Sequence, residues 1–303
     1  MIDSAQQGAS LDERVSIDPD YAARPGYDAE FLGTGSNLVP LPTLPDDLVA
    51  LTAVNNLAQE EPRYLLPYHH FSVVQNRERR LAFYTAVNID GASSMRLKRE
   101  RDRWFLDPRL AADEQTGEDA YRDNPLDRGH LVRRLDPAWG STREAAKTCN
   151  DDTFHFTNCT PQHEDFNQNQ STWAGLEDYI LENADNRDFR VSVFTGPIFA
   201  EDDQEFAGVQ LPRQYWKVVV MVKETGVLSA TAYLLSQEEL IAGLEIALES
   251  FSYGAYKTYQ VRVRRIEELT GMSFGSLADA DPLSELEATT AAFRIGRFDE
   301  IVL

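Results

Sequence analysis

The chain is poor in cysteine and has no long apolar run, and each shortage excludes a class of protein. Cys149 and Cys159 are the only cysteines among 303 residues. Two thiols are too few for a disulfide framework or for the four ligands of a structural zinc site. No run approaches the roughly 18 apolar residues of a membrane span. We therefore expect neither a metal-stapled scaffold nor a membrane partner.

Positive charge is also scarce. The chain carries 29 Lys+Arg against 50 Asp+Glu, a formal net charge of −21. A strongly acidic protein is a poor passive binder of nucleic acid, because contacts between basic side chains and phosphates supply most of the non-specific affinity. If this protein acts on nucleic acid, its positive charge must be concentrated locally.

The N-terminal part differs from the rest of the sequence. It lacks a basic segment followed by an apolar one, so no standard secretory signal is visible, and a reducing cytoplasm is the expected compartment, with export left open. Several prolines, scattered acids and little periodicity predict an arm over residues 1–60, followed by one folded domain over 61–303. The prolines include Pro25, Pro40, Pro42 and Pro45.

The domain mixes strand and helix patterns without regular alternation. β-branched and aromatic runs at 69–76 and 79–90 flank a charged turn and predict a hairpin. Similar runs predict strands at 192–195, 215–223 and 228–235, with a turn at 224–226. Apolar residues recur at helical spacing over 172–184 and 237–249. This mixture predicts an α+β fold.

Polar residues with catalytic chemistry gather between residues 123 and 181. In Asp127-Arg128-Gly129-His130, a histidine can act as a general base, the arginine can hold a phosphate, and the aspartate can orient either group. Glycine allows close approach of the backbone. A four-residue motif is weak by itself, and a surface ion pair beside a hydrogen-bonded histidine is the structural alternative.

A carboxylate on an apolar helix face gives a second indication. Glu177 falls within a stripe formed by Trp173, Leu176, Ile180, Leu181 and Ala184. Such a carboxylate is costly to bury unless it is paired or lies near a metal. A salt bridge to an arginine is the alternative.

These residues together resemble the DNA/RNA non-specific endonucleases, the ββα-metal (His-Me finger) nucleases that include endonuclease G and Serratia-type enzymes. The resemblance extends over about residues 65–280. It rests on ordered motifs: DRGH at 127–130, DTFHFTN at 152–158, Pro161-Gln162, Asn167-Gln168, Trp173, Leu176-Glu177, TGP at 195–197, PRQYWK at 212–217 and IEELTG at 266–271.

The resemblance implies a fold with a central, mostly antiparallel sheet flanked by helices. DRGH would end one strand, residues 154–158 would form another, and the 170s helix would close the site. His130 would be the general base, with a rate that rises through a pKa near 6–7. Arg128 matches the DRGH arginine, with Asp127 before it. Glu177 matches the glutamate that orients metal-bound water.

The same resemblance implies one divalent ion, usually magnesium with manganese as a substitute, held by one asparagine and several waters. Its ligand is either Asn167, five residues beyond Gln162, or Asn169, four residues before Trp173. At 100° per residue the two asparagines lie about 80° to either side of Glu177, so helical periodicity does not separate them. We prefer Asn167, because an apolar residue precedes it and a helix start readily absorbs an insertion.

A further arginine upstream of DRGH holds the phosphate in that family. The segment 96–103 carries five basic residues and two acidic ones, and its register against Trp104 selects either Arg101 or Arg103. We take Arg103. A solvated charged face accounts for most of the other positions.

The expected activity is magnesium-dependent cleavage of DNA and RNA to 5′-phosphate and 3′-hydroxyl ends. The alternatives are a catalytically inactive nucleic-acid-binding homologue and a structural homologue. Homodimerisation and a regulatory partner or inhibitor are left open. Residues 1–60 form the candidate regulatory surface.

Overall fold

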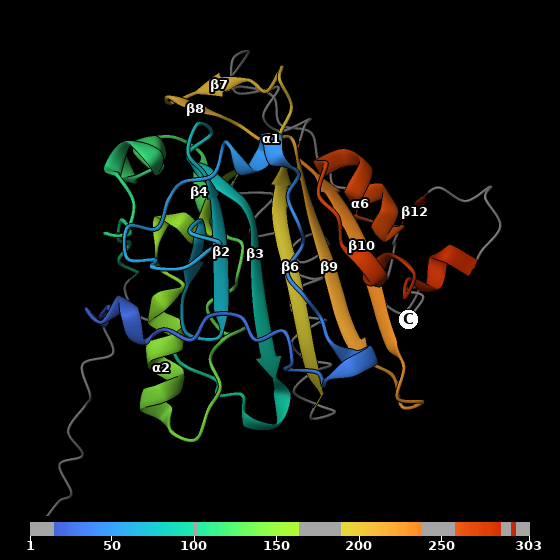
Figure 1. Ribbon diagram of the computed structural model, residues 1–303. Coiled ribbons are helices and arrows are strands. Elements are labelled where there is room, and N and C mark those ends of the chain that lie inside the picture. The colour runs from blue at the N-terminus through green and yellow to red at the C-terminus, as the bar shows by residue number, and fades with distance from the viewer. Residues whose placement is uncertain (1–14, 100–101, 164–188, 238–257, 286–291, 295–303) are drawn as a thin grey trace, which may run out of the picture.

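The fold is built on one large antiparallel sheet. A computed structural model describes residues 15–99, 102–163, 189–237, 258–285 and 292–294. Its central sheet has the strand order β1-β2-β3-β6-β9-β10-β11-β12, and each neighbouring pair is antiparallel (Figure 1). The bounds are β1 Leu65–Pro67, β2 Phe71–Asn76, β3 Leu81–Asp90, β6 Arg190–Ile198, β9 Gln214–Val222, β10 Leu228–Ser236, β11 Thr258–Val261 and β12 Ala292–Arg294.

Short helices and two small sheets surround the central sheet. The helices are α1 Asp46–Val49, α2 Arg143–Asp152 and α6 Val263–Thr270, with short 3-10 turns that include η5 Glu118–Tyr121 and η6 Phe156–Asn158. The small sheets pair β4 Leu126–His130 with β5 Cys159–His163, and β7 Glu205–Phe206 with β8 Val209–Gln210. Thr142 caps α2 by accepting a hydrogen bond from the Ala145 amide at 3.1 Å. Gly271, with φ of 72°, ends α6.

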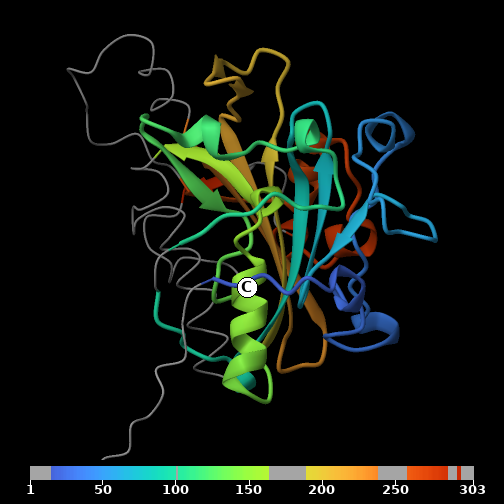
Figure 2. The ribbon, with the colours of Figure 1, turned by 90° about the vertical axis from the view of Figure 1, so that its left-hand side faces the viewer.

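The central sheet separates two apolar cores, because successive side chains of a strand point to opposite faces. Val73 packs into the core that contains Leu131 and Val132, next to β4. Its neighbour Val74 packs into the other core, with Ile266 of α6. Figure 2 shows the sheet from the side, with α2 and the β4–β5 pair toward one face and α6 toward the other. The N-terminal segment begins beside α2, where Ser16 and Arg24 contact Asp151 and Asp152, and continues to the α6 side, where Val39 and Leu44 are buried.

The structure confirms the predicted hairpin and strands. β2 and β3 pair with Phe71 opposite Val87, and a bulge lies between Val74 and Gln75. β6 and β10 contain the predicted strands 192–195 and 228–235, and β9 contains the predicted strand 215–223 apart from Lys223. The turn after β9 places Gly226 at φ of 81°. The predicted helices at 172–184 and 237–249 lie outside the described residues apart from Gln237, which is not helical.

The prediction of a strand over residues 154–158 is wrong. His155 forms only an isolated bridge to Phe105, and residues 156–158 form the 3-10 turn η6. The strand that pairs with DRGH begins at Cys159. Asn158 turns its side chain back to the backbone of Val132 and Thr153, which favours a compact turn over an extended strand.

The described part of the N-terminal segment packs against the sheet. Val39 and Leu44 belong to the core on the α6 side. Thr43 and Ser273 exchange backbone hydrogen bonds of 2.9 Å. Residues 15–60 therefore contribute to the core, while the boundary between an arm and a domain at residue 60 stays a prediction.

Candidate active site

The β4–β5 pair holds the DRGH residues in fixed register. Asp127 lies opposite Gln162, and His130 lies opposite Cys159. A Cβ atom on Gly129 would lie 2.2 Å from Cδ and Oε1 of Gln162. Only glycine therefore lets the buried Gln162 side chain lie across β4 at this point.

His130 lies between aromatic rings at the end of β4. Its ring centre is 4.6 Å from that of Trp104 and 5.1 Å from that of Phe154. The Nε2 atom is buried and has no hydrogen-bond partner among the described residues. Burial, together with the positive charges of Arg99 and Arg134 and against the opposing effect of Asp102, lowers the pKa of His130 to about 3. The ring is therefore neutral at pH 7 and able to accept a proton.

The backbone just after His130 is fixed by two buried side chains. Asn158 Nδ2 donates to the Val132 carbonyl at 2.9 Å, and the Val132 amide donates to Asn158 Oδ1 at 2.9 Å. Lys217 Nζ lies 3.0 Å from Thr195 Oγ1 and 3.5 Å from the Leu131 carbonyl oxygen. Both side chains come from the motifs that resemble the nuclease family, and both act here on the position of the strand end.

A polar cleft of about 620 Å³ opens beside Trp104. It combines arginines with carboxylates and contains three of the predicted site residues. Arg103 is exposed and lies over Phe105, with 4.8 Å between its guanidinium carbon and the ring centre. The described lining residues are Arg99, Asp102, Arg103, Trp104, Glu118, Asp127 and Arg128.

The charges in this lining are balanced. Three of the described lining residues are arginines and three are carboxylates. Arg99 pairs with Asp102 at 2.5 Å, and Arg128 pairs with Glu118. The hydrogen bond to Asp102, which outweighs the opposing effect of burial, raises the pKa of Arg99. The local excess of positive charge expected from the sequence is therefore absent from the described lining of this cleft.

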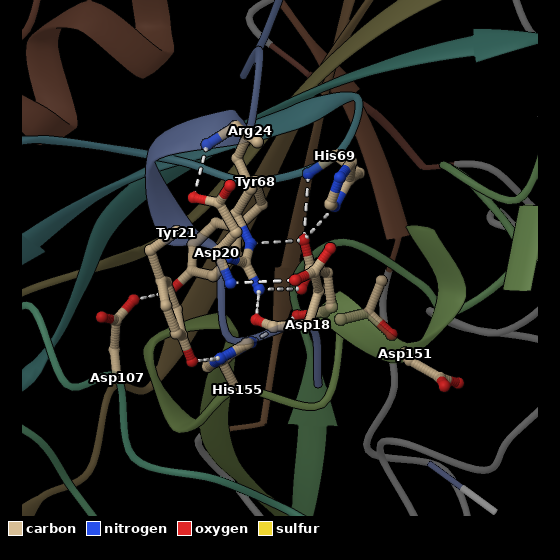
Figure 3. A network of polar contacts seen from close by, with 12 residues as sticks. Asp18, Asp20, Tyr21, Arg24, Tyr68, His69, Asp107, Asp151 and His155 are labelled. Atoms are coloured by element: carbon tan, nitrogen blue, oxygen red, sulfur yellow. Dashed lines mark hydrogen bonds and ion pairs between the residues drawn. The ribbon is translucent and has the colours of Figure 1, made fainter. Parts of the chain in front are cut away.

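A buried ionic network lies behind the turn that precedes β5 (Figure 3). Arg24 Nε and Nη2 donate to the two carboxylate oxygens of Asp152 at 2.8 Å each. His69 also contacts this carboxylate, with 2.7 Å between Nδ1 and Oδ2. Burial alone would raise the pKa of Asp152, but the hydrogen bonds from His69 and Arg24 outweigh burial and hold that pKa well below its usual range.

A second buried pair extends this network toward η6. Arg109 Nη2 donates to Asp107 at 2.7 Å, and Tyr68 donates its hydroxyl hydrogen to the same carboxylate. The Tyr68 oxygen also lies 2.6 Å from Thr157 Oγ1. Tyr21 completes the group with a 2.8 Å contact between its hydroxyl and His155 Nε2. These contacts fix η6, which carries Asn158 and leads into β5.

The structure places some of the predicted site residues and leaves others outside its described parts. Asp127, Arg128 and Arg103 line one cleft, and the cleft residue Trp104 packs on His130. The predicted residues Asn167, Asn169, Glu177 and Arg101 lie outside the described residues. Sequence reasoning missed Glu118 and Asp102 as partners of the cleft arginines. The sequence indicates these pairs only by short separations: Asp102 lies three residues from Arg99, and Glu118 lies ten residues from Arg128.

Within the described ranges, no group of three or more histidine, cysteine, aspartate or glutamate side chains could hold a metal ion. Cys149 and Cys159 are free and buried. No helix in the same part of the chain has the length and apolar character needed to cross a membrane.

Comparisons with known proteins agree with the resemblance seen in the motifs. The sequence profile of the DNA/RNA non-specific endonucleases matches residues 51–281. The uncharacterized protein y4fB of Sinorhizobium fredii (strain NGR234) is 41% identical over 285 residues, which cover 87% of this chain and 41% of that protein. This chain thus spans about two fifths of the length of that relative.

Two further relatives link the chain to nucleases. A nuclease of Nostoc sp. (strain PCC 7120) is 25% identical over 226 residues, which cover 74% of this chain and 78% of the Nostoc protein. The crystal structure of a complex of endonuclease G with EndoGI, which describes the inhibition of endonuclease G, matches with a TM-score of 0.53 and 18% identity. The match covers 71% of this chain and 86% of the endonuclease chain, and at that identity it shows a shared fold.

Proposed function

Because the chain belongs to the DNA/RNA non-specific endonuclease family, we propose that it is a metal-dependent nuclease that hydrolyses phosphodiester bonds of DNA and RNA. The observation that carries the proposal is the environment of His130. This histidine is held neutral at the end of β4 and packs on Trp104, a wall residue of the arginine-bearing cleft. Cleavage leaves 5′-phosphate and 3′-hydroxyl ends.

His130 acts as the general base. Its Nε2 atom is buried, so the other ring nitrogen, Nδ1, takes the proton from the attacking water. Contacts with Trp104 and Phe154 hold the ring plane, and Asn158 holds the backbone that follows it. The water then attacks phosphorus in line with the leaving 3′-oxygen.

The cleft binds the backbone of the substrate. Arg128 and Arg103 present guanidinium groups suited to phosphate oxygens, and Asp127 lies beside them in the same wall. Contacts to phosphates carry no base information, which fits cleavage with little sequence preference.

The proposed metal is magnesium, with manganese as a substitute, and its ligand is Asn167. When bound, such an ion would supply charge stabilisation for the phosphate and the leaving oxygen, and Glu177 would orient a water beside it. Oxygen donors suit this hard cation, and so does a site that leaves it most of its waters. Asn169 remains the alternative ligand.

A plasmid-nicking assay tests the proposal. We expect the protein to relax supercoiled plasmid in magnesium and to lose that activity in EDTA. His130→Ala removes the base and should lower the rate by about 10²–10⁴-fold while DNA binding persists. Phe83→Leu, a core change remote from the cleft, is the folding control.

Three other outcomes would contradict the proposal. A protein that binds DNA without nicking it is an inactive homologue. A protein that does neither is a structural homologue. Full activity of His130→Ala would remove His130 from the mechanism. Homodimerisation and control by a partner or inhibitor stay predictions, and sedimentation of the purified chain checks the first of them.

A further inference from the structure

The arginine of β4 is already bound by a carboxylate of the same chain. Arg128 Nε donates to Glu118 Oε2 at 3.1 Å, and Arg128 Nη2 donates to Oε1. A guanidinium group binds a phosphate through the same two-pronged geometry. The Glu118 carboxylate therefore occupies the donors that a substrate phosphate would need.

The local fold holds Arg128 in place for this exchange. Its guanidinium carbon lies 5.4 Å from the ring centre of Tyr121, which is buried on the same 3-10 turn as Glu118. Cys159 Sγ contacts the Tyr121 hydroxyl at 3.1 Å and so ties that turn to β5. The Glu118 side chain is 53% exposed. Rotation of this one exposed side chain is enough to free the arginine.

Arg99, which lines the same cleft, is also paired with a carboxylate. Its Nη2 and Nε atoms contact the two oxygens of Asp102 at 2.5 and 3.3 Å. Two arginines of the cleft are thus paired with carboxylates, and its described lining contains as many carboxylates as arginines. A phosphate must compete here with a carboxylate already in contact.

We propose that Glu118 is an internal competitor of the substrate phosphate for Arg128. Nucleic acid then binds the cleft by exchanging a carboxylate for a phosphate. The inference rests on the nuclease function proposed above. A nucleic-acid polymer can drive this exchange because it contacts several groups of the cleft at once. A mononucleotide product has a single phosphate and therefore binds the cleft weakly.

The exchange has a signature in the salt dependence of binding. A free arginine that neutralises a DNA phosphate releases condensed counterions, which adds about 0.9 to the slope of log K against log salt. When Glu118 is displaced, its carboxylate stays near the phosphate and offsets that neutralisation. Arg128 therefore contributes little to the slope until Glu118 loses its charge.

Matched charge variants on η5 test the proposal. Glu118→Gln removes the competitor, while Asp119→Asn removes the same charge one residue away, from a 92%-exposed side chain that pairs with Arg122. Binding of a fluorescein-labelled duplex is followed by anisotropy in EDTA, between about 50 and 200 mM salt. We expect Glu118→Gln to bind about two- to fivefold more tightly at the lowest salt, the size of a weak exposed ion pair. Its slope should steepen by up to about 0.9, and Asp119→Asn should match the wild type.

A double variant assigns the effect to Arg128. In an Arg128→Gln background, Glu118→Gln should leave the slope unchanged, because the group under competition is gone. Melting temperatures close to that of the wild type show that each variant is folded. Equal effects of Glu118→Gln and Asp119→Asn would reduce the result to net charge and overturn the proposal. Weaker binding by folded Glu118→Gln would make Glu118 a support for Arg128 and would also overturn it.

The nicking assay separates this inference from the function on which it rests. A wild-type protein that fails to nick plasmid in magnesium contradicts the proposed function whatever the binding slopes are. A wild-type protein that nicks, together with a Glu118→Gln variant of unchanged slope, contradicts only the competition at Arg128.

Discussion

At the scale of single residues, burial makes His130 a different base from the one its sequence predicts. An unperturbed histidine titrates near 6.5, and the motif predicts a rate that rises through a pKa of 6–7. The aromatic contacts and the nearby arginines instead lower the pKa of His130 to about 3. In the free protein the His130 ring is therefore neutral well below pH 6.

The pH dependence of cleavage should show this shift. The profile of kcat/KM reports groups of the free enzyme, so we expect no inflection from His130 between about pH 5 and 8. A phosphate beside the ring favours its charged form, so the acid limb of kcat should lie at higher pH than that of kcat/KM. Initial rates measured against pH under both regimes check this. An NMR titration that places the pKa of His130 near 6.5 in the free protein would contradict it.

The ion pair between Arg128 and Glu118 is a second feature at the residue scale. The DRGH motif predicts that Arg128 is a phosphate ligand, but it does not indicate Glu118, ten residues away, which the fold brings into contact with Arg128. Sequence reasoning named three residues that line the cleft and missed the carboxylates that pair with its arginines. Local pairing is set by tertiary contacts that residue types alone do not specify.

At the scale of elements, one glycine leaves the space in which the Gln162 side chain of β5 lies across β4. Gly129→Ala places a Cβ atom 2.2 Å from the Gln162 side chain, so that side chain or the strand must move. We expect a lower melting temperature and a loss of cleavage of about 10²-fold, the usual cost of misplacing a catalytic group by about 1 Å. Plasmid nicking and thermal unfolding measure both effects.

Two companion variants make this test specific. At Gly117 a Cβ atom would meet its nearest neighbour, Leu106, at an ordinary 3.6 Å, so Gly117→Ala should behave as the wild type. Adding Gln162→Ala to Gly129→Ala removes the clash and should restore part of the activity. Full activity of Gly129→Ala alone would show that cleavage does not depend on the space that Gly129 leaves for the Gln162 side chain.

The strands were more predictable than the turns between them. β2, β3, β9 and β10 alternate between two cores, and the resulting pattern of β-branched and aromatic residues is visible in the sequence. The alternation of Phe154, His155 and Phe156 predicts a strand equally well, yet this segment leads into η6. Its geometry is decided by the side chain of Asn158, which bonds to Val132, 26 residues earlier. A contact at that separation leaves no local periodicity.

At the scale of the whole molecule, one buried ion pair joins the N-terminal segment to the C-terminal end of α2. Arg24 and Asp152 are 128 residues apart, and both side chains are almost fully buried. The sequence predicts a separate acidic arm because Pro and Asp are frequent there, but such composition does not show which residue is the partner of a distant carboxylate. Removing one member of a buried pair leaves the other as an uncompensated charge.

Asp152→Asn should therefore destabilise the whole fold by about 3–5 kcal/mol at pH 7. Because the pKa of Asp152 is lower in the folded protein than in the unfolded chain, its contribution to stability is complete above the unfolded value of about 3.9 and is lost as the pH falls below it. Denaturant unfolding of both proteins from pH 7 to pH 3 should show their stabilities converging in acid. Asp279→Asn breaks the exposed pair with Arg264 and should change stability by less than about 0.5 kcal/mol at any pH. If Asp152→Asn and Asp279→Asn gave equal losses, the N-terminal segment would be packed against the nuclease fold without being anchored by Arg24. Its removal would then be compatible with a folded enzyme, as the interpretation of residues 1–60 as a separable arm requires.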